Sequence, residues 1–107
     1  MANSFKNAKV DLTTTNATTL YTAPNTARAI IKSILVSEDS GNADTITVTL
    51  TNASSAVFSL FKVKAVAANT TIELLTAPLV VTESEIIDLT AATANRLHVV
   101  ASLLEVS

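Results

Sequence analysis

Three carboxylates close together in the sequence, Glu83, Glu85 and Asp88, are the first candidates for chemistry. Two carboxylates held side by side can share a proton in acid–base catalysis or ligate a calcium ion. In an extended segment Glu83 and Glu85 would point to the same side. The aliphatic residues around Asp88 favour the alternative, a solvated turn that leads into a strand. We therefore expect neither an acid–base pair nor a metal site here.

A second run of oxygen-bearing side chains extends from Glu38 to Asp44 in the order Glu-Asp-Ser-Gly-Asn-Ala-Asp. Such oxygens at short spacing could ligate calcium, but the run lacks the Asp-x-Asp-x-Asn-Gly spacing and the distal Glu of an EF-hand. Gly41 and Asn42 tolerate the left-handed backbone of a tight turn. The run therefore predicts a polar hairpin loop between two strands.

The one histidine, His98, stands between Leu97 and Val99 and follows Arg96. A histidine that acts as a general base needs a nucleophile and an acid that orients its ring. Nothing in the sequence specifies either partner. We expect His98 to be a structural residue on a strand.

The amino-acid composition excludes most of the remaining enzyme templates. The 107 residues include no cysteine, one glycine and one histidine, which excludes disulfides, thiolate zinc sites, iron–sulfur clusters, histidine clusters and Gly-rich phosphate loops. With 49% hydrophobic and 15% charged residues, the chain is also too apolar to be disordered. We predict that the protein is not an enzyme and has no catalytic, cofactor-binding or metal-binding residues.

The charge pattern does not favour nucleic acid or membrane as a partner. The net charge is −2, and the basic residues are dispersed instead of forming a stripe: Lys6, Lys9, Arg28, Lys32, Lys62, Lys64 and Arg96. No apolar run approaches the roughly 20 residues that span a bilayer, and the N-terminus lacks the apolar core of a signal peptide. We expect no direct nucleic-acid partner, no membrane partner and no secretion.

The elements that carry these residues are predicted to be strands. Polar and apolar residues alternate without a break from Thr45 to Thr51, which is the two-residue period of a strand with one face on a core. Segments bounded by turn residues predict strands at residues 9–12, 18–22, 29–37, 44–51, 57–64, 71–75, 86–90 and 97–106. A turn about every ten residues is typical of an antiparallel sandwich. The predicted fold is all-β, an antiparallel β-sandwich of about eight strands with jelly-roll or immunoglobulin-like topology.

No repeat or linker divides the chain, so we expect a single sandwich domain over residues 9–107. Residues 1–8 are predicted to form an extended N-terminal arm, in which Phe5 is the only large anchor. The alanine-rich segments 64–69 and 90–95 are predicted to be loops, because helices of such length are marginal.

Two of the predicted strands are apolar on both faces. In residues 30–36 and 97–104, aliphatic side chains occupy both odd and even positions. Such strands are covered on both sides in known sheets. The opposite sheet covers one side, and with no helix to cover the other we expect a partner subunit to do so.

Four phrases of the sequence resemble small structural proteins in the virions of tailed bacteriophages, the marine cyanophage group in particular. They are residues 1–8, residues 18–24, the strand 29–36 with its Ser- and Asn-rich hairpin, and the closing residues 99–106. The resemblance implies a β-sandwich that assembles on a capsid or a tail. It implies a capsid decoration or cement protein that binds the major capsid protein, or other virion proteins, and its own copies as a homo-oligomer. The implied location is the virion, after assembly in the host cytoplasm.

Two other functions stay open beside this one. A tail, neck or fibre-associated sandwich protein has the same implied fold. A host-glycan-binding module is the third function, although sugar platforms need exposed aromatic faces and the chain has only Phe5, Tyr21, Phe58 and Phe61.

Overall fold

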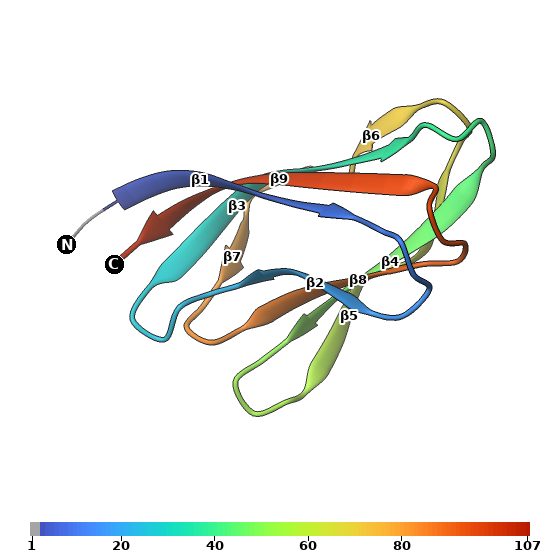
Figure 1. Cartoon of the computed structure of the whole chain (residues 1–107). Coiled ribbons are helices and arrows are strands. Elements are labelled where there is room, and N and C mark those ends of the chain that lie inside the picture. The colour runs from blue at the N-terminus through green and yellow to red at the C-terminus, as the bar shows by residue number, and fades with distance from the viewer. Residues whose placement is uncertain (1–2) are drawn as a thin grey trace.

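Two antiparallel sheets pack face to face around one hydrophobic core in the computed structural model, which describes residues 3–107 (Figure 1). The larger sheet has the order β1 (Asn3–Asp11), β9 (Leu97–Val106), β3 (Arg28–Glu38) and β6 (Thr71–Glu73), and β7 (Leu79–Val81) also pairs with β3. The smaller sheet has the order β2 (Thr18–Thr22), β8 (Ile86–Ala91), β4 (Asp44–Thr51) and β5 (Val57–Val66). The predicted antiparallel β-sandwich is confirmed.

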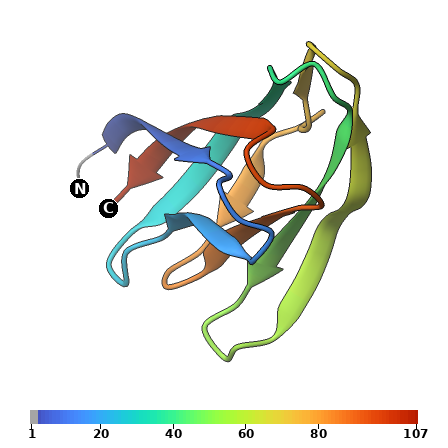
Figure 2. The ribbon, with the colours of Figure 1, turned by 45° about the vertical axis from the view of Figure 1, so that its right-hand side comes forward.

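The strands pair as nested partners along the chain. The first strand, β1, pairs with the last, β9; inside that pair, β2 pairs with β8, β3 with β6 and β7, and β4 with β5. Alternate pairs fall into different sheets, so the chain is one long antiparallel ribbon folded over itself (Figure 2). This connectivity is that of a jelly roll, which excludes the immunoglobulin-like alternative.

Strand β4 shows how the sequence builds the core. Ile46 and Val48 have no exposed surface, whereas Thr45 before them and Thr47 between them are half-buried on the other side of the sheet. The alternation read in the sequence therefore separates a core face from an outer face. In β9 every second residue from Leu97 to Leu103 is likewise buried.

The predicted strand bounds are correct for β2, β4 and β9. The alanine-rich segments contain no helix, but they were predicted wrongly as loops throughout, because residues 64–66 continue β5 and residues 90–91 continue β8. The prediction missed β7, which follows Pro78 and is only three residues long. Strand β6 also ends at Glu73, two residues before its predicted end. Both differences have a tertiary cause, because β6 and β7 pair with two separate parts of the long strand β3.

Most of the segment predicted as an N-terminal arm lies in β1. Asn3 to Ala8 pair with β9 residue by residue, from Asn3 opposite Val106 to Ala8 opposite Ala101. Met1 and Ala2 lie outside the described residues. The side chains of residues 3–7 are exposed, although each residue pairs with β9. Pairing with β9, and not burial, therefore holds this part of the strand in place.

The edge strand β5 contains two β-bulges. Its register against β4 shifts between Ile46 and Val48 and again between Val48 and Thr49. Near the first shift Val63 has a φ of 53°, which is unfavourable for a β-branched residue, and its N–H donates to Thr47 Oγ1 at 3.0 Å. Bulges twist an edge strand and interrupt its row of free backbone groups, which opposes pairing with another chain.

Candidate functional site

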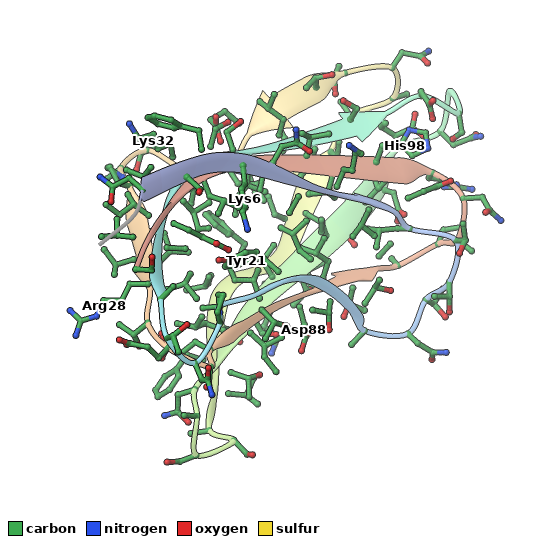
Figure 3. All side chains as sticks on the ribbon, turned by 60° about the vertical axis from the view of Figure 1, so that its left-hand side comes forward. Lys6, Tyr21, Arg28, Lys32, Asp88 and His98 are labelled. Atoms are coloured by element: carbon green, nitrogen blue, oxygen red, sulfur yellow. The ribbon has the colours of Figure 1, made fainter. Side chains whose placement is uncertain are left out.

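The carboxylates Glu83, Glu85 and Asp88 do not form a common site. Glu83 forms an exposed ion pair with Arg28, 3.2 Å from its Nε. Asp88 Oδ1 accepts a hydrogen bond from the Thr19 hydroxyl at 2.8 Å, and Glu85 accepts one from the backbone of its own turn at 2.8 Å. Arg28 and Asp88 lie well apart (Figure 3). The turn predicted before β8 is confirmed, and its carboxylates act separately.

The loop between β3 and β4 uses its carboxylate to bind its own backbone. Glu38 is only 2% exposed, and its two oxygens accept hydrogen bonds from the N–H groups of Ser40, Gly41 and Asn42. The N–H of Asn69, in the turn after β5, donates to the same carboxylate at 3.2 Å. Burial alone would raise the pKa of Glu38, but the hydroxyl of Ser40 and these N–H groups outweigh it and lower the pKa to about 2. The predicted hairpin loop is confirmed, and Glu38 joins it to a second turn.

His98 lies between two carboxylates at one end of the larger sheet. Its Nε2 is 3.2 Å from Asp11 Oδ1, and its Nδ1 is 3.4 Å from Asp39 Oδ2. Both ring nitrogens therefore face side chains of neighbouring segments, β1 and the β3–β4 loop. Within residues 3–107, no three His, Asp or Glu side chains are grouped so that they could hold a metal ion.

A polar contact bridges the two sheets where β2 approaches β9. The Tyr21 hydroxyl donates to Glu105 Oε2 at 2.5 Å, and Lys6 Nζ lies 2.9 Å from Glu105 Oε1. The side chains of Tyr21 and Lys6 point into the space between the two layers (Figure 3). Burial, and then the hydrogen bond to Glu105, raise the pKa of Tyr21, while the hydrogen bonds from Tyr21 and Lys6 lower the pKa of Glu105.

Removing the Tyr21 hydroxyl should measure this bridge. We expect Tyr21→Phe to lower the free energy of unfolding in urea by about 1.5 kcal/mol, because Glu105 loses a donor in a half-buried position. A double-mutant cycle with Glu105→Gln should give a coupling energy of about 1 kcal/mol. Additive effects of the two substitutions would show that the sheets are not joined through this contact.

Several exposed apolar side chains lie on the outer face, meaning the side of the larger sheet that is turned away from the core. A row of four aliphatic or aromatic side chains crosses this face from β1 to β7: Phe5, Leu104, Ile30 and Val80. Phe5 is 78% exposed. Farther along the strands, Val100 and Leu35 lie opposite each other and are each 40% exposed. The two strands predicted to be covered on both faces are thus covered by this chain on one face only.

Two further exposed apolar side chains, on the smaller sheet, lie at the turn end of the β4–β5 hairpin. Val57 is 62% exposed and Phe58 is 54% exposed, at the start of β5. As consecutive residues of a strand, Val57 and Phe58 point to opposite sides of the smaller sheet, and this pair is separate from the outer face. The other two aromatic residues, Tyr21 and Phe61, pack against the core and offer no flat exposed ring.

An open groove of ≈ 890 Å³ lies where β5 ends and β6 begins. Alanine, threonine and aliphatic side chains provide most of its lining, including Ala43, Ala65, Ala67 and Ala92. Its one carboxylate, Asp44, already accepts a hydrogen bond from the N–H of Thr93 at 3.1 Å. The groove is therefore lined mainly by apolar groups, and its carboxylate is already engaged within the chain.

The sequence indicated several of these groups, but not their partners. His98 and the run from Glu38 to Asp44 were singled out for their residue types. Glu105 was not, because Tyr21 lies 84 residues away from it and only the folded sheets bring them together. The doubly apolar strands were the one signal that pointed to the outer face.

No protein-family model and no curated protein matches the sequence. Among solved structures, the fold is similar to a chain from the Bacillus endospore appendages, described as disulfide-linked pili, at a TM-score of 0.59 and 12% identity, over 98% of this chain and 88% of that one. It is also similar to a chain of infectious bursal disease virus, Gt strain, at a TM-score of 0.50 and 12% identity, over 98% of this chain and 30% of that one. A chain of the cyanophage Pam1 capsid asymmetric unit matches at a TM-score of 0.44 and 19% identity, over 96% of this chain and 83% of that one. At these identities the first two likenesses show the fold alone.

Across residues 3–107, no helix is long and apolar enough to cross a membrane.

Proposed function

We propose that this chain is a non-enzymatic structural protein of a phage virion, a decoration or cement protein on the head. It binds the major capsid protein and its own copies, and it is incorporated into virions assembled in the host cytoplasm. The observation that carries the proposal is that exposed apolar side chains occur at two separate places on a small jelly roll, namely on the outer face and, as the pair Val57 and Phe58, at the turn end of the β4–β5 hairpin.

Two surfaces suit a protein that must hold two kinds of neighbour at once. Exposed apolar area of this kind marks interaction sites on soluble domains. Jelly rolls are a recurring architecture of viral capsid proteins and of lectins, and the likeness to a chain of a virus is in keeping with the first use. Many copies on a lattice add weak contacts into strong attachment, so no single deep site is required.

The position of the chain on the particle distinguishes a head protein from a tail protein. Gold-labelled antibody against the chain is expected to bind over the heads of intact particles of the phage that encodes it. Label at the tail or neck would support the tail-associated alternative instead. Particles that carry no label would contradict both.

The pair Val57 and Phe58 gives a sharper test of attachment to the head. We expect the double substitution Val57→Lys with Phe58→Lys to lower the occupancy of purified protein on stripped heads at least about tenfold, since two charges replace the apolar contact. Ala53→Lys, in the exposed turn of the same hairpin, adds a charge without removing an apolar group and should bind normally. Equal binding by the unchanged protein and both variants would exclude this end of the hairpin as the capsid contact.

A further inference from the structure

Among residues 3–107, the edge formed by β1 differs from every other sheet edge. The larger sheet ends at β1 on one side and at β6 and β7 on the other, and the smaller sheet ends at β2 and β5. Strand β5 has two bulges, β2 shifts register between Thr19 and Tyr21, and β6 and β7 have three residues each. The nine residues of β1, by contrast, pair with β9 without a shift (Figure 2). Bulges and short length protect an edge from pairing with other chains, so β1 is the edge that lacks this protection.

The hydrogen bonds at the end of β1 show which of its backbone groups face outward. Leu12, directly after β1, donates its N–H to the carbonyl of Leu97 at 3.0 Å, and its own carbonyl accepts the N–H of Asn95 at 2.8 Å. The backbone groups of Leu12 therefore face β9 and the turn before it. Because these groups alternate in direction along a strand, the even-numbered residues of β1 face β9 and the odd-numbered residues face away from it. The outward row consists of the N–H and C=O groups of Asn3, Phe5, Asn7, Lys9 and Asp11.

From these observations we propose that β1 pairs antiparallel with β1 of a second copy, so that the two larger sheets join into one continuous sheet. A regular row of outward N–H and C=O groups is a template for another strand, and main-chain pairing needs no pocket. Within residues 3–107, the one unprotected edge that a second copy can offer is again its β1. Two identical edges pair about a two-fold axis perpendicular to the sheet, which closes the assembly as a dimer.

The two lysines of β1 limit where this axis can cross the strand. A residue at the axis faces its own counterpart in the other copy, so an axis at Lys6 or Lys9 would bring like charges directly together. Asn7 and Ala8 lie between the lysines, and an axis at either residue sets outward-facing groups of the two copies opposite each other. Lysine on an edge strand opposes pairing, but the ammonium of Lys6 already has a counter-charge, since its Nζ lies 2.9 Å from Glu105 Oε1. Asn7 or Ala8 is therefore the residue at the axis.

This inference deepens the proposed function, because it names the edge through which copies meet, and it rests on that function only for its biological setting. Sedimentation equilibrium of the purified full chain should show a dimer of the 11.2 kDa subunit. Asn7→Pro removes an outward-facing N–H and leaves the hydrogen bonds between β1 and β9 in place, which is where an edge strand tolerates proline. It should weaken dimerisation at least about 30-fold, because each dimer loses two backbone hydrogen bonds. The matched control Asn7→Ala keeps the N–H and should leave the dimer intact.

Disulfide formation between copies tests the position of the axis without relying on the proline variant. Residues directly opposite each other in an antiparallel pair have Cα atoms about 4.5–5.5 Å apart, which a disulfide can span. Under mild oxidation, Asn7→Cys or Ala8→Cys should therefore give a covalent dimer on a non-reducing gel. Ala53→Cys, in the exposed turn of the β4–β5 hairpin, is the control and should stay monomeric on the gel. Circular dichroism and the urea midpoint confirm that each variant is folded.

Three outcomes would overturn the inference: a monomer at millimolar concentration, equal dimerisation of the folded Asn7→Pro and Asn7→Ala variants, or no more cross-linking at residues 7 and 8 than at Ala53. A monomer that still binds heads would refute the pairing of copies, leave the proposed function standing and make a strand of another protein the partner of β1. A dimer that is absent from every particle would refute the proposed function and leave the pairing standing.

Discussion

Replacing Glu38 with glutamine is expected to lower the melting temperature by on the order of 10 °C at neutral pH. The amide keeps one acceptor oxygen but loses the charge, and its NH2 group faces the N–H groups of Gly41 and Asn42, which already point at this position. Two turns are affected, because Asn69 also donates to this carboxylate. Differential scanning calorimetry of both proteins measures the effect.

The same residue predicts how stability depends on acid. The pKa of Glu38 is about 2 in the folded chain, against an ordinary value of 4.5. Between these values the unfolded chain binds more protons than the folded one, so stability falls as the pH falls from about 4.5 toward 2. The glutamine variant should show a shallower loss over this range. Parallel curves for the two proteins would mean that another group causes the acid unfolding.

Replacing Ile46 with alanine is expected to lower the free energy of unfolding by about 3 kcal/mol. Ile46 is the third residue of β4 and has no exposed surface, so the truncation leaves a cavity in the core between the two sheets. Against a typical total of about 5–15 kcal/mol, this loss is a large fraction of the stability. Urea unfolding monitored by circular dichroism gives the value.

Thr49→Ala is the matched control for this prediction. Thr49 lies on the same strand but on the outer side, where it is half-buried, and its change should stay within about 0.5 kcal/mol. The ratio of the two effects measures how strictly the alternating pattern separates core from surface. Similar losses for both would indicate that both faces of β4 are equally packed.

The parts of the fold that could be predicted are the strands whose own sequence alternates between polar and apolar residues. Residues 44–51 alternate so regularly that the strand and its buried side follow from the sequence. Strand β7 has three residues and no period, and it exists because β3 is long enough to pair with two partners. No local pattern could reveal a strand that depends on a distant neighbour in this way.

The candidate surface was predictable in kind but not in arrangement. Aliphatic residues at both parities in β3 and β9 indicated a second covered face. The rows across that face depend on register, which places Phe5 opposite Leu104 and Leu104 opposite Ile30. The bridge from Tyr21 to Glu105 likewise joins strands of different sheets, and register between sheets is set only by packing.

The nested pairing of β1 with β9 also determines how the chain responds to force. Because Asn3 lies opposite Val106, β1 begins and β9 ends side by side at the same end of the sheet. Tension applied between them would open the backbone hydrogen bonds one after another, as in a zipper, which is the weak direction of an antiparallel pair. Tension transmitted through the two sheet faces would instead load many contacts together. The fold should therefore resist stretching by neighbours on its faces far better than stretching by its own ends.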